Sequence, residues 1–460
     1  MRFKLSFGLA LGLAGCAVGP DYRAPAPAVP QTWLEAPKDS AAAESLPDWR
    51  SALRDDELTR LMTKALADNF DLRLALARVE QARAERGGAR SRLMPTLDAS
   101  GGAQRQNNPF PGLAPGIKYN MFELGFDAAW EVDAFGRLQR RLESAGADAE
   151  AAAEDYRQAV VVLGAELTRT YLNYRYLQRE WRITRDNLEL QKRSLHLTEL
   201  LVSEGVAART DAAQAHAQVE ASAASLAALE ADLAVDRRQL ETLTAQRPGA
   251  LDAELAAQAD APALPERTLL AAPACVLRQR PDVRAAERRL ASATAMQGAA
   301  MAEMYPNISL SAFIGFRNTD AASMFKSSAF AYSSAASFAA PLLNFGRIQA
   351  NINLADAKQN EALLSYEKTV LDALQETETA LGRYAREQTR RQALANSAAD
   401  MREKLRLAEM SFGEGTLSNL QVLDAKRILN GAELDLARSE AATAYHWVAV
   451  YKALGAGAGS

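Results

Sequence analysis

The chain has little of what catalysis, metal binding or nucleic-acid binding requires. Its three histidines, His196, His216 and His446, lie far apart and form neither an HExxH motif nor a pair at metal-ligand spacing. No P-loop, dinucleotide fingerprint or nucleophile elbow occurs. A net charge of -4 without a concentrated Lys/Arg stripe lacks the electrostatic footprint that phosphate backbones need. We therefore expect no enzyme, no cofactor, no metal and no nucleic-acid partner.

Cysteine and long apolar runs are also scarce. The two cysteines are Cys16 and Cys275, and after residue 16 no uninterrupted run of about 18 apolar residues occurs. The sequence therefore predicts no transmembrane helix. If Cys16 is modified, only Cys275 remains as a thiol, which excludes an intrachain disulfide in the mature chain and predicts a buried, inert side chain.

The first sixteen residues predict a lipoprotein signal. Arg2 and Lys4 precede an apolar stretch from Leu5 to Leu13, and the sequence Leu-Ala-Gly then ends at Cys16. This ending resembles the bacterial lipobox, so residues 1–15 are expected to be removed and Cys16 to be lipidated. The alternative is a plain secretory signal with a chance cysteine. Because Ala17 and Val18 are not the acidic signal that retains such lipoproteins at the inner membrane, we expect sorting to the outer membrane.

The most informative feature is a duplication. A strand-like segment passes into a long Ala-rich helical stretch twice, and in each copy a Glu-Gly pair interrupts the helix 68 residues later. The paired landmarks are Gly136 and Gly346, Gly205 and Gly415, each 210 residues apart, and Pro95 and Pro306, 211 apart. The chain is therefore one fold made of two tandem copies of a large unit.

Each copy contains two segments in which apolar residues alternate with polar or small ones. The four segments are Leu97–Ala103, Phe122–Trp130, Ile308–Phe316 and Phe330–Phe338. The turn-rich stretches 107–116 and 318–328 make each pair a hairpin. Such strands are long enough to cross a bilayer when tilted. The alternative is a pair of hairpins in a soluble sheet, which the targeting signal disfavours.

Four strands cannot close a barrel by themselves. Open sheet edges are not tolerated in lipid, and bacterial barrels begin at about eight strands. The membrane interpretation therefore requires several chains to share one barrel. Two chains give eight strands and three chains give twelve.

The remaining sequence predicts long helices. Between Gly136 and Gly205 the residues are strong helix formers without proline, a run on the order of 100 Å long. Helical sequence resumes after each Glu-Gly break, so each break is the tip of a helical hairpin. Apolar faces of Ala and Leu opposite charged faces fit a curved helical wall. A solvated coiled coil without a lumen is the alternative.

These patterns give the expected domain organisation, with a short helix opening each copy. The expected segments are the signal peptide 1–15, the lipid anchor and N-terminal equatorial segment 16–54, the first copy 55–248 with β-hairpin 96–130 and helical hairpin 137–243, the equatorial linker 249–273, and the second copy 274–460 with β-hairpin 307–341 and helical hairpin 347–451.

Several stretches of the sequence resemble a known family. The chain looks like the outer-membrane factors of bacterial tripartite efflux systems, the TolC-like family, and most closely its lipoprotein branch with OprM and NodT. The matching stretches, spread over nearly all of the mature chain, are 16–22, 69–72 with 81–83, 166–178, 280–283 with 286–290, 305–310, 423–425 and 451–455. Their order and spacing together make the match specific.

The resemblance implies a mainly α fold with a transmembrane β-barrel. It implies a homotrimer in the outer membrane, with four strands per chain in a shared twelve-strand barrel and a long α-helical periplasmic tunnel. A mixed equatorial region would come from about Val29–Arg54 and Gly249–Pro273. The implied partners are outer-membrane lipid, a periplasmic adaptor and an inner-membrane pump of the RND type. The implied function is passive efflux of drugs or other small toxic compounds.

The resemblance also assigns residues at the periplasmic end. The closure of related channels involves a leucine and an aspartate just after the second hairpin tip, which match Leu420 and Asp424 here. Four apart on one helical face, they would form a hydrophobic ring and an anionic ring in a trimer. Three facing carboxylates would favour a bound cation. Arg209 and Asp211, past the first tip, are candidates for contacts between neighbouring hairpins, and Asp424 remains open to interpretation as an ordinary helix-start aspartate.

Three other functions remain as alternatives. A type I secretion duct would use the same architecture. A lipid-anchored periplasmic adaptor would carry helical hairpins without conducting, but it would not need the alternating segments near Phe126 and Ile314. A secreted pore-forming toxin fits the helices and not the lipobox at Cys16.

Overall fold

The computed structural model describes residues 17–37, 41–42, 53–107, 118–257, 259–265 and 269–455. The expected signal peptide, Cys16 and most of the first strand loop lie outside the described residues. The chain divides into two compact units, the first comprising Met1–Ala26, Arg78–Ala153 and Ala285–Glu367, and the second comprising Pro27–Ala77, Glu154–Arg284 and Lys368–Ser460.

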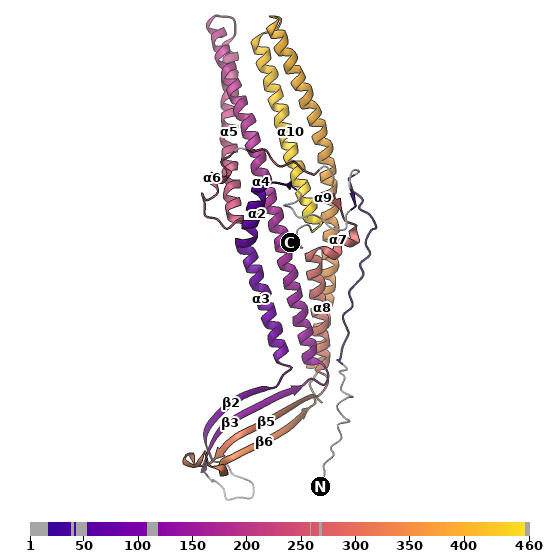
Figure 1. Ribbon diagram of the computed structural model, residues 1–460. Coiled ribbons are helices and arrows are strands. Elements are labelled where there is room, and N and C mark those ends of the chain that lie inside the picture. Colours follow the sequence, from indigo (N-terminus) through magenta and orange to yellow (C-terminus); the bar gives the residue numbers. More distant parts are fainter. Residues whose placement is uncertain are drawn as a thin grey trace. The chain divides into compact units, whose positions relative to one another are not determined.

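The elements follow the duplicated order expected from the sequence (Figure 1). In chain order they are β1 (Ala41–Ala42), α2 (Asp56–Asp68), α3 (Phe70–Ser91), β2 (Thr96–Asn107), β3 (Lys118–Val132), α4 (Arg137–Ser203), α5 (Arg209–Leu243), α6 (Asp252–Leu255), β4 (Leu269–Leu270), α7 (Pro273–Gln279), α8 (Pro281–Ala302), β5 (Asn307–Asn318), the 3-10 turns η1 (Ala321–Ser323) and η2 (Ser327–Ala329), β6 (Phe330–Ala339), α9 (Arg347–Gly413) and α10 (Asn419–Ala453).

The first unit contains a four-stranded antiparallel sheet in the order β2-β3-β5-β6 (Figure 1). The two hairpins predicted from the sequence are joined through β3 and β5, whose paired residues have numbers that add up to 440, as in Phe126 opposite Ile314. Adjacent strands thus bring like faces together, because side chains alternate along each strand. The order of the strands could not be read from the alternation.

Helices of equal length repeat in the two copies. α4 and α9 have 67 residues each, and α5 and α10 have 35 each. Helices this long are stabilised by packing along their length more than by intrinsic propensity. The equality of the lengths shows that the internal repeat in the sequence is a repeat of structure.

The second unit has the main hydrophobic core. Trp447, Tyr171 and Tyr451 are almost completely buried, and the Trp447 and Tyr451 ring centroids lie 4.2 Å apart. The core is covered by α2, whose N-cap Asp55 accepts a hydrogen bond from the backbone N–H of Leu58 at 2.8 Å. Within the same unit, the segments expected to be equatorial supply β1 and β4, which pair in parallel.

Several details differ from the sequence expectations. β3 ends at Val132 and α10 at Ala453, each two residues beyond the expected end, whereas β6 ends at Ala339, two residues short of it. Cys275, expected to be buried, is only partly buried at the margin of the core, and its sulfur accepts a hydrogen bond from Gln279 Nε2 at 3.3 Å. Sequence alone does not reveal how fully a short helix such as α7 is covered.

Candidate functional site

One face of the four-stranded sheet is apolar and exposed. Phe126 and Ile314 are each 53% exposed, and Tyr332 beside Ile314 is 79% exposed. A large exposed apolar surface of this kind marks a surface that meets lipid or another protein. The face also includes Leu97, Leu124, Trp130, Leu310, Phe330 and Phe338.

The opposite face is polar and carries its own network. Arg317 Nε donates a hydrogen bond to Glu123 Oε2 at 2.7 Å, and its guanidinium lies 4.8 Å from the centre of the buried Phe313 ring. Ser100 donates a hydrogen bond to Asp127 on the same face. A sheet with one apolar and one charged face suits a boundary between lipid and water. The sequence alternation predicted these faces, but not the pairing of Arg317 with Glu123, which are far apart in the chain.

Both edges of this sheet are open in the described chain. β2 pairs only with β3, and β6 pairs only with β5. Each edge strand therefore has backbone N–H and C=O groups directed away from the sheet. Such edges are templates for another strand, and they are incompatible with hydrocarbon unless they are paired.

The segment that follows Cys16 is held by the start of α4. The N–H of Val18 donates a hydrogen bond to the Phe135 carbonyl oxygen at 3.2 Å. Arg140, which is 4% exposed, donates hydrogen bonds to the carbonyl oxygens of Val18 and Gly19, at 3.2 and 3.3 Å, and to Asp21 Oδ1 at 2.8 Å. This fixes the N-terminal segment next to the point where β3 ends.

Close backbone contact explains the glycine in that segment. A Cβ atom on Gly19 would come within 2.4 Å of the Gly298 Cα, and Gly19 has a φ of +97°. Tyr22 then donates a hydrogen bond to Glu287 Oε1 at 2.9 Å. Residues 18–22, part of the stretch that resembles the family, thus dock on the start of α4 and on α8, a role that the sequence does not reveal.

The two hairpin tips have the same backbone conformation. Gly205 and Gly415 have φ values of +72° and +74°, in the left-handed region that favours glycine. After them the N–H of Val206 bonds to the Leu201 carbonyl, and that of Thr416 to the Ser411 carbonyl, at 2.8 and 2.9 Å. These bonds satisfy carbonyls left over at the helix end. The tips are therefore equivalent in backbone and differ in their side chains.

At the first tip, Asp211 has a local role. Its Oδ2 accepts a hydrogen bond from the N–H of Ala208 at 3.2 Å, in the first turn of α5. Gln421 does the same for Ser418 at the start of α10, at 2.9 Å. Arg209 is exposed as the first residue of α5. The structure thus uses Asp211 as a helix-start residue, while contacts of Arg209 with a neighbouring hairpin remain a prediction.

At the second tip, Leu420 and Asp424 lie in the first turns of α10. Leu420 is 42% exposed, and Asp424 Oδ1 accepts a hydrogen bond from Arg427 Nη2 at 2.8 Å. The Asp424 and Arg427 side chains are both about half exposed. This ion pair was not foreseen, and it partly neutralises the carboxylate that the sequence suggested as a cation ligand. The gate assignment remains a prediction.

A buried polar chain links three helices of the second unit. Asn173 on α4 donates a hydrogen bond to Asp236 Oδ2 on α5 at 2.7 Å and accepts one from the Tyr445 hydroxyl on α10. Asp236 is 7% exposed, and burial raises the pKa of its carboxyl to about 6. Nearby Asp232 raises this pKa further, while the hydrogen bond from Asn173 and the charge of Arg169 oppose the rise.

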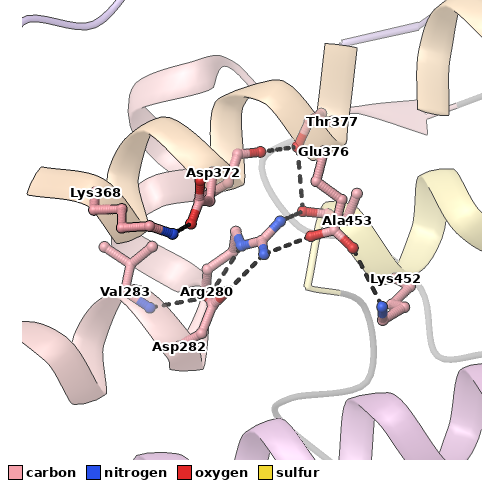
Figure 2. A network of polar contacts seen from close by, with 10 residues as sticks. Arg280, Asp282, Val283, Lys368, Asp372, Glu376, Thr377, Lys452 and Ala453 are labelled. Atoms are coloured by element: carbon pink, nitrogen blue, oxygen red, sulfur yellow. Dashed lines mark hydrogen bonds and ion pairs between the residues drawn. The ribbon is translucent and has the colours of Figure 1, made fainter. Parts of the chain in front are cut away.

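A second buried network involves the motif that starts α8 (Figure 2). Arg280, whose side chain is 6% exposed, bonds to Asp282 Oδ2 at 2.6 Å, to Glu376 Oε2 at 2.7 Å and to the Ala453 carbonyl oxygen at 2.6 Å. Lys452 Nζ also contacts Glu376, at 3.2 Å. The network joins α8, α9 and the end of α10 in the second unit.

Neither metal sites nor membrane-spanning helices are found in the described part of the chain. No group of three or more His, Cys, Asp or Glu side chains there is arranged to hold a metal ion. Among the same residues, every helix is too short or too polar to cross a membrane. His446 is partly buried, which lowers its pKa, and His216 lies 3.9 Å from Glu220.

Comparison with known proteins places this chain among outer-membrane proteins. The profile of the family described as outer membrane efflux protein matches residues 61–246 and 273–456, one segment in each copy. Nodulation protein T of Rhizobium leguminosarum bv. trifolii is 28% identical over 459 residues, covering 100% of this chain and 97% of the relative.

Two further comparisons agree over the same length. The toluene efflux pump outer membrane protein TtgI of Pseudomonas putida is 30% identical, with 99% of both chains covered. The solved structure of the outer-membrane channel OprN is 36% identical and superimposes with a TM-score of 0.90, covering 97% of this chain and 100% of that one. The similarity therefore extends over both copies and both units.

Proposed function

Because the chain belongs to the outer membrane efflux protein family, it is an outer-membrane efflux channel of TolC-like fold, and we propose that it is the passive exit duct of a tripartite pump. In this role the protein catalyses no reaction. The energy comes from a transporter in the inner membrane, and the duct provides a path across the outer membrane. The function of the chain is then to assemble a pore and to gate it.

The four-stranded sheet is the observation that carries the proposal. It has an exposed apolar face, a charged face and two open edges. A barrel closed by several chains removes the edges and directs the apolar face to lipid. We propose a homotrimer whose barrel has twelve strands, as the TolC-like fold implies. A dimer would give a barrel of eight strands.

Cys16 is proposed as the site of lipidation. The supporting observation is the docking of the next residues, in which Arg140 and the Phe135 carbonyl fix Val18 beside the end of β3. If β3 crosses the membrane, acyl chains on Cys16 would start close to the membrane boundary. A lipid chain anchors more strongly with each buried methylene, so this would reinforce the barrel.

Leu420 and Asp424 are proposed as gate residues at the periplasmic mouth. Their support is their position in the first turns of α10 beside an exposed tip, together with the difference between the two tips. In a trimer, Leu420 would supply an apolar constriction and Asp424 an ionic one. The pair between Asp424 and Arg427 makes a closed ring held by ion pairs more favourable than a ring of three bare carboxylates.

The partners are proposed from the family and the exposed tips. A periplasmic adaptor would engage the hairpin tips, and an inner-membrane pump of the RND type would deliver the substrate. One relative is named for the efflux of toluene, a small apolar toxic compound. We propose substrates of the same kind here, drugs and other small toxic molecules, entering a wide lumen of low selectivity.

Site-directed labelling in intact cells tests this arrangement. Ala322→Cys, in the loop between β5 and β6, should react with a membrane-impermeant maleimide in intact cells. Glu414→Cys, at the second tip, should react only after the outer membrane is permeabilised. Single-channel recording of the purified protein provides the functional readout. Labelling of both sites in intact cells, or no conductance from a correctly assembled protein, would contradict an outer-membrane duct.

A further inference from the structure

The open edges of the sheet can be matched to each other by the internal repeat. From this match we propose that β6 of one subunit pairs antiparallel with β2 of the next, in a register where the residue numbers of opposite residues add up to 439. The proposal rests on the proposed trimer, and it adds the contacts by which the trimer closes.

The register follows from offsets that the structure itself fixes. Opposite residues add up to 225 between β2 and β3 and to 646 between β5 and β6. The two sums differ by 421. This is the total of a shift of 211 residues from β2 to its repeat β5 and a shift of 210 residues from β3 to its repeat β6. The same two shifts separate Pro95 from Pro306 and Phe135 from Phe345.

The seam between β3 and β5 then serves as a template for the seam between subunits. The numbers of opposite residues in this seam add up to 440. Replacing β3 by its repeat β6 adds 210 and replacing β5 by its repeat β2 subtracts 211, so the sum between subunits becomes 439. Ser337 thus lies opposite Gly102 of the partner subunit, as Asp127 lies opposite Phe313 within the chain. Likewise, Ala336 lies opposite Ala103 of the partner subunit.

The two faces of the sheet support this register independently. The apolar residues have even numbers in β6, such as Phe338, and odd numbers in β2, such as Leu97. An odd sum therefore continues the apolar face across the seam, whereas a slip of one residue would turn the apolar residues of one strand toward the charged face. Odd sums such as 437, 439 and 441 all keep the faces matched, and the internal repeat selects 439 among them.

Exposed residues just beyond β6 have partners in the same arrangement. Within the chain, Phe135 stacks on Tyr305 with ring centroids 4.9 Å apart. The equivalent residues across the seam are Phe345, which is 93% exposed, and Met94 of the partner subunit, a residue that is 58% exposed. A thioether against an aromatic ring is a favourable contact. The repeat thus assigns Phe345 the same role between subunits that Phe135 has within one.

The seam between subunits lacks the bulky network of the template. Phe313 corresponds to Gly102, and Glu123 corresponds to Ser333, which excludes an equivalent of the ion pair between Arg317 and Glu123. A Cβ atom added to Gly102 meets no atom within 4 Å. Subunit pairing therefore depends on backbone hydrogen bonds and the apolar face. The open space at Gly102 also means that a cysteine can be introduced there without a clash within the subunit.

Disulfide trapping of the intact trimer tests the register, in full-length protein carrying Cys275→Ser. The test pairs are S337C with G102C and A336C with A103C. Two neighbouring pairs are needed because consecutive antiparallel pairs alternate between hydrogen-bonded and the closer non-hydrogen-bonded geometry. The matched controls are S337C with Q104C and S337C with S100C, which lie on the same face with sums of 441 and 437.

We expect oxidation to yield covalent dimers and trimers from at least one test pair, at roughly ten times the yield of either control, because a shift of two residues exceeds the reach of a disulfide. Migration in native gels reports the trimer separately. An intact trimer in which a control crosslinks best, or in which neither test pair crosslinks, would overturn the register and leave the proposed function standing. Absence of any oligomer would overturn the proposed trimer itself.

Discussion

Arg280 binds the end of α10 by donating a hydrogen bond from Nη1 to the carbonyl oxygen of Ala453 at 2.6 Å (Figure 2). The last carbonyls of a helix lack partners within the helix, and here the buried Arg280 guanidinium and, at 3.4 Å, the Thr377 hydroxyl donate hydrogen bonds to one of them. The same guanidinium forms ion pairs with Asp282 and Glu376. A single side chain from the sequence 280–283 thus connects three helices of the second unit.

We expect Arg280→Lys to lower the free energy of unfolding by about 2–3 kcal/mol. The lysine ammonium lacks the planar fork with which the guanidinium reaches Asp282, Glu376 and the Ala453 carbonyl together. At least one of these groups would therefore lose its hydrogen bond while it stays buried. Arg386→Lys is the matched control, since Arg386 is exposed and pairs with the half-exposed Glu35, and it should cost under about 0.5 kcal/mol. Denaturant unfolding measures both variants, and equal losses would remove the special role of Arg280.

The effect of Arg280→Lys should also depend on pH. Burial opposes ionisation of Glu376, but the hydrogen bonds and charges of Arg280 and Lys452 together outweigh it, so the Glu376 pKa lies below its ordinary 4.5. The stabilisation from the pair is therefore present above that value and is lost as the pH falls below it. The difference between the variant and the wild-type protein should shrink in acid, and a constant difference would contradict this assignment.

Sequence analysis predicted the elements because their signals are local. Alternation specified the two faces of each strand, and the Glu-Gly landmarks specified the tips that Gly205 and Gly415 form. It did not predict that β3 lies beside β5, because alternation gives faces and not neighbours. Nor did it foresee the contact of Arg140 with Val18 or of Arg317 with Glu123, since each joins residues more than 100 positions apart.

At the tips, positions could be predicted from the sequence and contacts could not. Asp211 was a candidate for contacts between neighbouring hairpins and Asp424 for an anionic gate ring, yet Asp211 accepts a hydrogen bond from its own helix start and Asp424 pairs with Arg427 three residues later. Short-range partners of this kind are available to any exposed carboxylate in a helix. Neither contact could be distinguished in advance from contacts that form only between subunits.

Asp236→Asn should remove a pH-dependent destabilisation. Because burial raises the Asp236 pKa from 3.8 to about 6, the stabilisation by the neutral form is fully present below 3.8 and is lost as the pH rises through about 6. At pH 7 the variant, which stays neutral, should be more stable than the wild-type protein by about 3 kcal/mol. Asparagine can still accept the hydrogen bond from Asn173.

Thermal unfolding of the detergent-solubilised protein between pH 4 and pH 8 checks the Asp236 prediction. The two proteins should have closer midpoints at pH 4 than at pH 7. Asp232→Asn is the control, because Asp232 is exposed on the same helix and only adds to the shift at Asp236. Parallel curves for Asp236→Asn and the wild-type protein would show that Asp236 does not titrate in this range.

A charge on the apolar face of the sheet should prevent assembly in the outer membrane. We expect Phe126→Lys to cost about 2–4 kcal/mol if the face meets the bilayer midplane, whereas Ser311→Lys, on the polar face, should be tolerated. Both substitutions are in exposed positions of paired strands. The readout is the amount of heat-modifiable protein in outer-membrane fractions, and equal amounts of the two variants would argue against lipid at this face.

The gate proposal predicts a change in conductance without a change in assembly. Leu420→Ala combined with Asp424→Ala should raise single-channel conductance in planar bilayers severalfold, because the constriction and its ionic ring are both removed. Arg427→Gln separates two mechanisms, since it breaks the ion pair with Asp424 and leaves the carboxylate in place. If ion pairs hold the ring closed, Arg427→Gln should raise conductance as Asp424→Asn does. Arg209→Ala, at the first tip, is the control, and unchanged conductance in the double variant would remove Leu420 and Asp424 as gate residues.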